Sequence, residues 1–305
     1  MTEKVIEVRD LRKSYGSFVA VDCISFEVFR GEIFGLLGPN GAGKTTTLEC
    51  LEGLRQPDSG WLRVMGIDPA SKARALRDKV GVQLQASGMP ANITVREALH
   101  LFSAYHGIKP DFRLIDRMGL GGKHDVQYEQ LSGGQKRRLA LALAVAHHPS
   151  VIFLDEPTAA LDVQSRVELH ELMAEFRHDG ITIILSTHDM AEAEKLADRV
   201  AILVSGKLIA VGTPREITAT GAGLTKISVH TERATLSETG TLPGVVQRAS
   251  KEGYDIFYTT DTAASIAAVL DYLEDHQDVV EDLRVERPSL EDRFLEITAK
   301  TEATA

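Results

Sequence analysis

The stretch Gly38-Pro39-Asn40-Gly41-Ala42-Gly43-Lys44-Thr45 decides the fold of this 305-residue chain. It fits the pattern GxxxxGK followed by Ser or Thr, and it lies between an apolar run at 33–38 (IFGLLG) and a helical pattern at 45–54. Glycines allow backbone N–H groups to turn toward phosphate oxygens, and the start of a helix adds partial positive charge. A glycine-rich turn with a surface lysine would match the same sequence pattern, but the strand–loop–helix context favours a phosphate site.

The side chains at the end of this loop predict how a nucleotide is held. We expect Lys44 to bridge the β- and γ-phosphates and the Thr45 hydroxyl to bind Mg²⁺, with the backbone from Gly38 to Thr46 surrounding the phosphates. The sequence therefore predicts a nucleoside-triphosphate site with Mg²⁺ as its metal.

A second stretch, Val151-Ile152-Phe153-Leu154-Asp155-Glu156, supplies carboxylates. Four apolar residues indicate a buried strand, and its carboxyl end is where ligand sites of α/β sheets form. We expect Asp155 to hold Mg²⁺ through water and Glu156 to orient or deprotonate the water that attacks the γ-phosphate. A lone Asp-Glu pair is more often a surface feature, but the buried strand and the phosphate loop favour catalysis here.

The rest of the N-terminal part predicts an α/β fold. Strands that alternate with helices indicate a parallel sheet covered on both faces. The expected buried strands are at 33–38, 151–154 and 181–185, and the expected helices at 136–147, 163–178 and 189–197. Residues 4–9 predict a strand and 18–29 two short strands around a turn, which together form an antiparallel β subdomain. Helical patterns at 89–130 predict a helical insertion, which we place at about 88–140.

The character of the chain changes after about Pro214. Residues 212–223 (GTPREITATGAG) are rich in turn formers, so we expect a nucleotide-binding domain at 1–217 and an accessory domain at 218–305. The order strand, hairpin, helix, strand, helix predicts a small α+β domain. Residues 226–305 hold 8 Lys+Arg and 16 Asp+Glu, so they carry −8 of the net charge of −10. A solvated surface explains this acidity, and an electrostatic switch is the sharper alternative.

Composition excludes several classes of protein. The net charge of −10 argues against a general nucleic-acid binder. Cys23 and Cys50 are too few for a disulfide framework, which indicates free thiols in a reducing compartment. The start MTEKVIEVRD shows no signal pattern, and the longest uncharged apolar stretch, 139–154, has 16 residues where a membrane span needs about 20. We expect a soluble, cytoplasmic protein.

A second anion site is predicted at Leu131-Ser132-Gly133-Gly134-Gln135, which precedes a basic helix. A chain that binds one nucleotide has no obvious need for two phosphate sites. The economical interpretation is that Ser132 to Gln135 of each copy close on the ATP of the other copy. These residues resemble the nucleotide-binding subunits of ATP-binding-cassette (ABC) transporters, whose signature is LSGGQ, and the resemblance covers about residues 4–215.

The resemblance implies roles for four further residues. Tyr15 matches the aromatic residue that stacks on adenine, although an aromatic residue alone would more often be core. Gln85 matches the glutamine that contacts Mg²⁺ or its water at the joint with the insertion, and Gln83 is a nearby alternative. In Ala159-Ala160-Leu161-Asp162 only Leu161 and Asp162 match the family's pattern closely. The match implies that Asp162 lies at the contact between copies. His188 matches the histidine that contacts the γ-phosphate, so the implied catalytic set is Lys44, Glu156 and His188.

The resemblance also implies function and partners. Residues 288–298 (PSLEDRFLEIT) resemble the C-terminal end of ATPases from drug, lipid or polysaccharide exporters, including the daunorubicin-resistance type. We therefore expect an ATPase that powers export through a separate transmembrane permease, which docks beside Gln85 and the helical insertion and holds the ATPase at the inner face of the membrane. Two copies, or one copy and a paralogous ATPase subunit, should sandwich two ATP molecules.

Two other functions fit part of the pattern. A soluble ABC ATPase of translation or DNA repair would use the same motifs as a clamp, but translation types usually carry two cassettes and repair types a long coiled coil. A P-loop kinase would have no use for LSGGQ.

Overall fold

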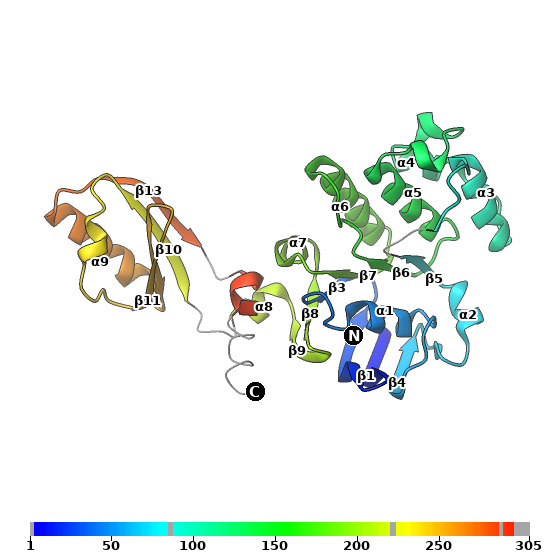
Figure 1. Ribbon diagram of the computed structural model, residues 1–305, viewed down its shortest axis with the longest axis horizontal. Helices are drawn as coiled ribbons and strands as arrows, with labels where there is room; N and C mark the ends of the chain where they lie inside the picture. The colour runs from blue at the N-terminus through cyan, green and yellow to red at the C-terminus, as the bar shows by residue number, and fades with distance from the viewer. Residues whose placement is uncertain (1–2, 85–87, 220–223, 287–288, 296–305) are drawn as a thin grey trace. The chain divides into compact units, whose positions relative to one another are not determined.

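The computed structural model describes residues 3–84, 88–219, 224–286 and 289–295. The chain divides into two compact units, Met1–Thr213 and Pro214–Ala305 (Figure 1). In the described ranges, no helix combines the length and apolar character that a bilayer-spanning segment requires.

The core of the first unit is a six-stranded sheet in the order β5-β6-β7-β3-β8-β9. The first five strands run parallel and β9 is antiparallel to β8, which confirms the predicted parallel sheet. Every residue of β3, β6 and β7 is buried, as their continuous apolar runs predict. The strands are β3 (Ile33–Leu37), β5 (Val80–Gln83), β6 (Val151–Asp155), β7 (Thr182–Thr187), β8 (Arg199–Val204) and β9 (Lys207–Gly212).

A three-stranded antiparallel sheet in the order β2-β1-β4 adjoins this core. Its strands are β1 (Lys4–Tyr15), β2 (Phe18–Phe29) and β4 (Ser59–Val64). The prediction of two short strands at 18–29 is wrong, because β2 is one strand of 12 residues. Cys23 has φ 54° where the β1–β2 register shifts, so the irregularity is absorbed as a bulge and not as a turn.

Helices cover both faces of the six-stranded sheet. Figure 1 shows α1 and the three-stranded sheet on one side, and α5, α6 and α7 on the other. Gly81 of β5 leaves no room for a Cβ atom because the carbonyl of Ala144 in α5 lies against it, so these two backbones are in direct contact. The helices are α1 (Lys44–Leu51), α2 (Ala73–Arg77), α5 (Gly133–Val145), α6 (Val163–His178) and α7 (Met190–Leu196).

The helical insertion precedes α5. Thr94 caps its first helix, because the Thr94 hydroxyl accepts from the Glu97 N–H while the Glu97 carboxylate accepts from the Thr94 N–H. The insertion contains α3 (Val95–Tyr105), α4 (Phe112–Arg117) and the short 3₁₀ helices η1 (Gly121–Lys123) and η2 (Tyr128–Gln130).

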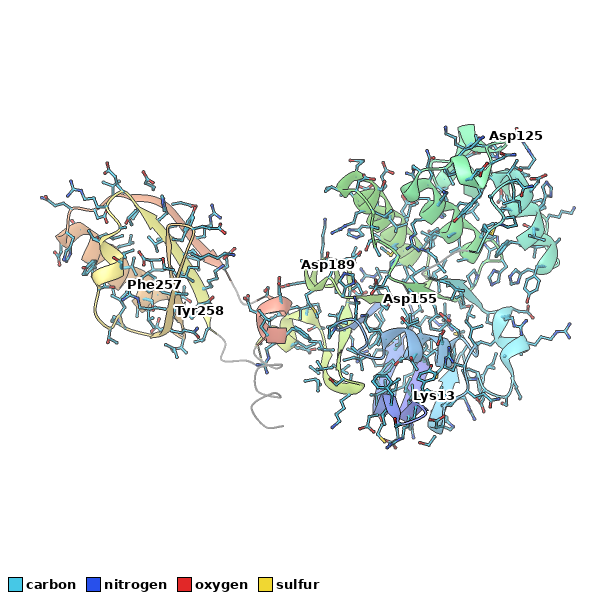
Figure 2. All side chains as sticks on the ribbon, viewed as in Figure 1. Lys13, Asp125, Asp155, Asp189, Phe257 and Tyr258 are labelled. Atoms are coloured by element: carbon cyan, nitrogen blue, oxygen red, sulfur yellow. The ribbon has the colours of Figure 1, made fainter. Side chains whose placement is uncertain are left out.

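The second unit is a small α+β fold. Its antiparallel sheet has the order β11-β12-β10-β13, and Phe257 lies in a core formed with Ile227, Val229, Val269 and Leu273 (Figure 2). The predicted order of elements is present, but the turn-rich stretch at 212–223 contains the helix α8, which begins at a proline, a residue suited to a first helical position. The elements are α8 (Pro214–Ala219), β10 (Thr225–Thr231), η3 (Thr235–Glu238), β11 (Val245–Lys251), β12 (Tyr254–Thr259), α9 (Thr262–Asp275) and β13 (Val280–Glu286), and residues 290–295 are helical.

Candidate functional site

The loop between β3 and α1 is held tightly by its neighbours. Gly38 has φ 152° and Gly43 has φ 99°, and a Cβ atom on either would meet a backbone carbonyl, that of Leu203 or that of Ala20. Only glycine fits at these two positions, which explains the glycines of the motif. Lys44 Nζ donates to the carbonyl oxygens of Gly38 at 2.8 Å and Pro39 at 3.1 Å, so the ammonium group lies over the loop.

Side-chain oxygen atoms that could bind a metal ion lie close together where β6 ends. Thr45 Oγ1 donates to Asp155 Oδ1 at 3.3 Å, and Ser186 Oγ donates to the same oxygen. The pairing of β6 with β7 brings this about, because it places Asp155 opposite Ser186. A hydroxyl and a carboxylate are ligands that suit Mg²⁺, which usually takes one or two protein carboxylates together with substrate phosphates. These residues therefore fit a nucleotide-bound magnesium ion.

Glu156 has an unusual backbone conformation. Its φ of 46° lies in the left-handed region, where a non-glycine residue costs about 1–2 kcal/mol. The Glu156 N–H is held by both the carbonyl and the hydroxyl of Ser186, each at 3.1 Å. This geometry places Glu156 Oε1 3.7 Å from Lys44 Nζ and 3.2 Å from His188 Nδ1. The three predicted catalytic residues, which follow β3, β6 and β7, therefore lie together.

The electrostatics of the site centre on Lys44. Burial lowers the pKa of Lys44, and the carboxylates of Glu156 and Asp155 oppose that shift. Two acidic groups and one ammonium group thus share the space beside the loop. Phosphate oxygens would add negative charge at this position, and the lysine is the group that can compensate it.

A cavity of about 410 Å³ extends from this cluster to Tyr15. Tyr15 is 40% exposed, so it is not a core aromatic residue. Its ring lies 5.1 Å from the guanidinium carbon of Arg55 and 5.9 Å from Lys13 Nζ. The lining residues are Tyr15, Phe18, Ala20, Asn40, Gly41, Gly43, Lys44, Thr45, Thr46 and Glu156.

The LSGGQ stretch forms a second surface with Asp162. Ser132 caps α5, because its hydroxyl accepts from the Gln135 N–H at 3.2 Å and its own N–H donates to Gln135 Oε1 at 3.0 Å. Asp162 caps α6 by accepting from the N–H of Ser165 at 2.9 Å and from its hydroxyl at 2.7 Å. These hydrogen bonds hold the pKa of Asp162 below its ordinary value.

Ser165 joins the two helix starts. A Cβ atom on Gly134 would collide with the Ser165 hydroxyl, so α5 and α6 begin in contact with each other. Among the described residues that line the 410 Å³ cavity, none belongs to 132–135 and none is Asp162. The residues predicted to act across a pair of chains are therefore together, and they are separate from the cavity of their own chain.

Comparison with known proteins identifies the family. Residues 21–159 match the family model described as ABC transporter. The chain is 38% identical to the "Nod factor export ATP-binding protein I" of Paraburkholderia xenovorans (strain LB400), over 98% of this chain and 99% of that protein. A protein of the same name from Bradyrhizobium diazoefficiens is 37% identical, over 98% of each chain. The chain belongs to the ATP-binding subunits of ABC transporters. It binds and hydrolyses ATP as the nucleotide-binding subunit of an export system.

Solved structures agree with this family. The ABC ATPase is similar to one described as "Structure of ATP binding subunit of ABC transporter", with a TM-score of 0.66, 28% identity and coverage of 72% of this chain and 93% of that chain. It is also similar to cbiO1 from Clostridium perfringens, part of the ABC transporter complex cbiONQ, with a TM-score of 0.64, 30% identity and coverage of 72% and 92%.

Sequence reasoning missed two residues near the nucleotide site of the ABC ATPase. Phe18 is 59% exposed and lines the cavity with Tyr15, and Ser186 touches both Asp155 and Glu156. The sequence signal for Phe18 was an aromatic residue at the start of a predicted strand. For Ser186 the sequence offered no signal. Gln85 lies outside the described residues, and its role stays a prediction.

A buried polar network behind His188 was also missed. Glu192 Oε1 lies 2.9 Å from His170 Nε2, and Glu192 Oε2 accepts from Thr187 Oγ1 at 2.9 Å. Burial pushes the pKa of Glu192 upward, but hydrogen bonds from His170, Thr158 and Thr187 hold it below its ordinary value. The network connects α6 to the residue that precedes His188.

Proposed function

We propose that this ABC ATPase works as a pair, formed by two copies or by one copy and a paralogous ATPase subunit, that closes around two ATP molecules. In each site one chain supplies the loop from Gly38 to Thr46. The other chain supplies Ser132, Gly133, Gly134, Gln135 and Asp162. The observation that carries this proposal is the contact of the two helix starts through Ser165, outside the cavity that holds Lys44.

In each site the chain's own residues bind and orient the nucleotide. We propose that Tyr15 stacks on adenine, that Lys44 neutralises phosphate charge, and that Glu156 orients the attacking water and accepts its proton. His188, 3.2 Å from Glu156, would contact the γ-phosphate. Thr45 and Asp155 would hold Mg²⁺, with Gln85 as a further ligand. When bound, the metal supplies positive charge that stabilises the phosphate oxygens.

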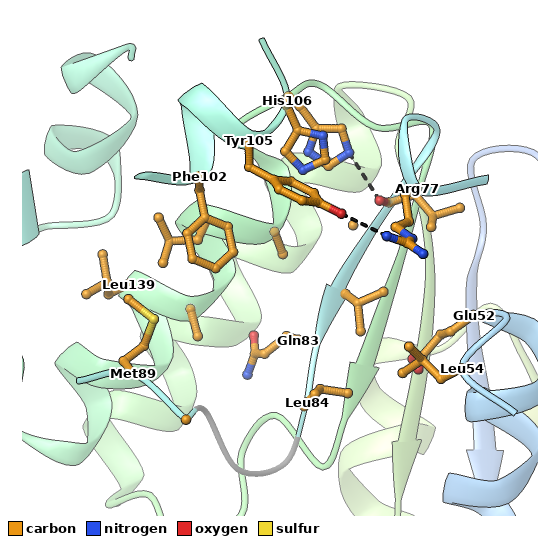
Figure 3. Close-up of a pocket in the computed structure, with 18 of the residues that line it drawn as sticks. Glu52, Leu54, Arg77, Gln83, Leu84, Met89, Phe102, Tyr105, His106 and Leu139 are labelled. Carbon is orange, nitrogen blue, oxygen red and sulfur yellow. Dashed lines mark hydrogen bonds between the residues drawn. The ribbon is translucent and has the colours of Figure 1, made fainter. Parts of the chain in front are cut away.

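The family works with a membrane partner, and we propose that here it is a separate transmembrane permease. Its docking site would be a cavity of about 680 Å³ between the end of α1, β5, α3 and α5, which we call the docking groove (Figure 3). Its size and its largely apolar lining suit a protein segment. The apolar lining includes Leu54, Val82, Leu84, Met89, Phe102 and Leu139. Docking there would hold the ATPase at the cytoplasmic face of the membrane.

Mixing two inactive variants tests the paired site. Ser132→Arg should block closure because its bulk falls in the partner's γ-phosphate site, and Lys44→Ala should lose phosphate binding. In a mixed dimer one site carries both defects and the other carries neither, so ATPase activity should partly recover. A site built within one chain predicts no recovery. An ATPase rate in the mixture no higher than that of either variant alone would contradict the proposal.

A further inference from the structure

Glu52 is a buried acidic residue on the wall of the docking groove. It follows α1 as its C-cap and is only 5% exposed. Among the described residues, nothing donates a hydrogen bond to its carboxyl group or forms an ion pair with it. Burial raises the pKa of Glu52 to about 8, and the carboxylates of Asp155 and Glu49 act in the same direction. The C-terminal end of a helix is also unfavourable for a negative charge.

Gln83 is a second polar side chain of the groove without a partner. It is 2% exposed, and within the described part of the chain neither its amide oxygen nor its amide nitrogen has a hydrogen-bond partner. Figure 3 shows its amide in the groove, between the wall with Glu52 and Leu54 and the wall with Met89 and Leu139. Buried polar side chains normally have such partners, so the groove lacks polar groups that a bound segment would supply.

The other polar groups of the groove do not neutralise Glu52. Arg77 Nη1 donates to the Tyr105 hydroxyl at 3.0 Å. The rings of His106 and His147 stack at 3.8 Å, and burial lowers the pKa of both, so they add no positive charge near neutral pH. The groove is therefore largely apolar, and its acidic group, Glu52, forms no ion pair with any described residue, Arg77 included.

We propose that the docking segment of the membrane subunit carries a lysine or arginine that enters the groove and pairs with Glu52, while a peptide or amide group of the same segment pairs with Gln83. This inference rests on the proposed docking of the membrane subunit in the groove. Burial keeps a proton on Glu52 in the isolated chain, and a cation brought beside it would favour the ionised form and compensate its desolvation. A segment with an acidic residue at that point would be rejected. Glu52 thus selects the partner by charge.

The test uses the full chain and the membrane subunit of its export system, purified in detergent. Labelled ATPase is titrated onto the immobilised membrane subunit. Glu52→Gln should weaken binding at least about tenfold, since it removes one partner of a buried pair, and Glu52→Lys should abolish detectable binding. Glu171→Gln is the matched control, because it removes the same charge from an exposed position on α6 and should bind like the wild-type chain. Thermal unfolding of each variant verifies the fold.

Charge exchange identifies the partner residue. Each Lys and Arg in the cytoplasmic segments of the membrane subunit is replaced in turn by Glu. One of these changes should restore binding of Glu52→Lys and weaken binding of the wild-type chain, an effect that a merely structural role for Glu52 would not produce.

The outcomes separate this inference from the proposed function. If the wild-type chain binds the membrane subunit and the Glu52 variants bind equally well, the charge pairing is wrong and docking stands. If the wild-type chain does not bind at all, docking itself is wrong. If Glu52→Lys changes the self-association of the isolated chain and leaves binding to the membrane subunit intact, the occupant is a second copy and the inference is overturned.

Discussion

His170 Nε2 lies 2.9 Å from Glu192 Oε1, and the two side chains are 9% and 2% exposed. The other oxygen of Glu192 accepts from Thr187, which precedes His188 in the chain. His170 lies on α6, whose N-cap is Asp162, so this buried pair connects the surface expected to face the second chain with the residue expected to face the γ-phosphate. Glu192 does not line the 410 Å³ cavity, and we expect it to act as a positioning residue for His188.

Glu192→Gln should therefore reduce kcat by about tenfold, equal to about 1.4 kcal/mol, with little change in KM for ATP. The amide keeps the size of the side chain but loses the charge that holds His170 and Thr187. Steady-state ATPase kinetics give the split between kcat and KM, with Glu171→Gln as the control on an exposed face. A change confined to KM would show that the network shapes nucleotide binding and not the orientation of His188.

Glu156→Gln should leave ATP binding intact and lower turnover by at least about 100-fold, because an amide cannot accept the proton of the attacking water. The variant should also accumulate an ATP-bound dimer that is visible by gel filtration. Hydrolysis at the wild-type rate would refute the assignment of the base.

Lys44→Ala should show the opposite pattern. It removes a fixed charge from beside the phosphates, so ATP affinity itself should fall by tenfold or more, which is at least about 1.4 kcal/mol. Equilibrium binding of a fluorescent ATP analogue measures the loss. Normal affinity would count against the loop as the phosphate site.

Glu52→Gln should stabilise the isolated chain, and more so at high pH. The pKa of Glu52 is about 8 in the folded chain and 4.5 ordinarily. Between these values the folded state keeps a proton that the unfolded state has lost, so this group makes stability fall as pH rises through that window. The variant lacks this loss, and its advantage in the free energy of unfolding should reach about 1–3 kcal/mol near pH 8. Urea denaturation at pH 5 and pH 8 measures it, and an equal difference at both values would contradict the prediction.

Truncation after about residue 222 should leave a folded chain that binds ATP, with altered turnover or altered coupling to the membrane subunit. Every described residue assigned to the nucleotide lies between Tyr15 and His188, and residues such as Phe257 and Val269 form a separate core in the second unit. The division into domains at 1–217 and 218–305 stays a prediction until this is done. A folded truncation that no longer binds ATP would overturn it.

The parallel core was predictable because its signals are local. The runs at 33–37 and 151–154 carry no polar side chain, and such runs arise where a strand is buried on both faces. Helix α6 has the predicted bounds of 163–178 because its start carries a capping aspartate and a glycine follows its end. The sequence could not show that β2 is a single strand, because the conformation of Cys23 depends on pairing with β1.

The candidate site also has one part that the sequence predicts and another part that it does not. The phosphate loop, Asp155 and Glu156 are adjacent in sequence to strands that the apolar pattern reveals. Contacts such as Ser165 with Gly134, or His170 with Glu192, join residues 22 or more positions apart through helix packing. From the sequence, Glu52 and Gln83 would be expected on the surface, as most glutamates and glutamines are. Only the structure shows that both side chains are buried.

The contact between Gly81 and Ala144 determines how the LSGGQ surface can move. Since the backbones of β5 and α5 touch there, α5 has a fixed point near its C-terminal end. Ser132 lies twelve residues before Ala144, which in a helix is about 18 Å. A tilt of only about 10° around that fixed point would carry Ser132 by about 3 Å, comparable to the length of a hydrogen bond. If Ser132 contacts a nucleotide of the opposite chain as proposed, the helix would act as a lever arm, and a sub-ångström adjustment beside β5 would be enough to bring the serine to that nucleotide or to withdraw it.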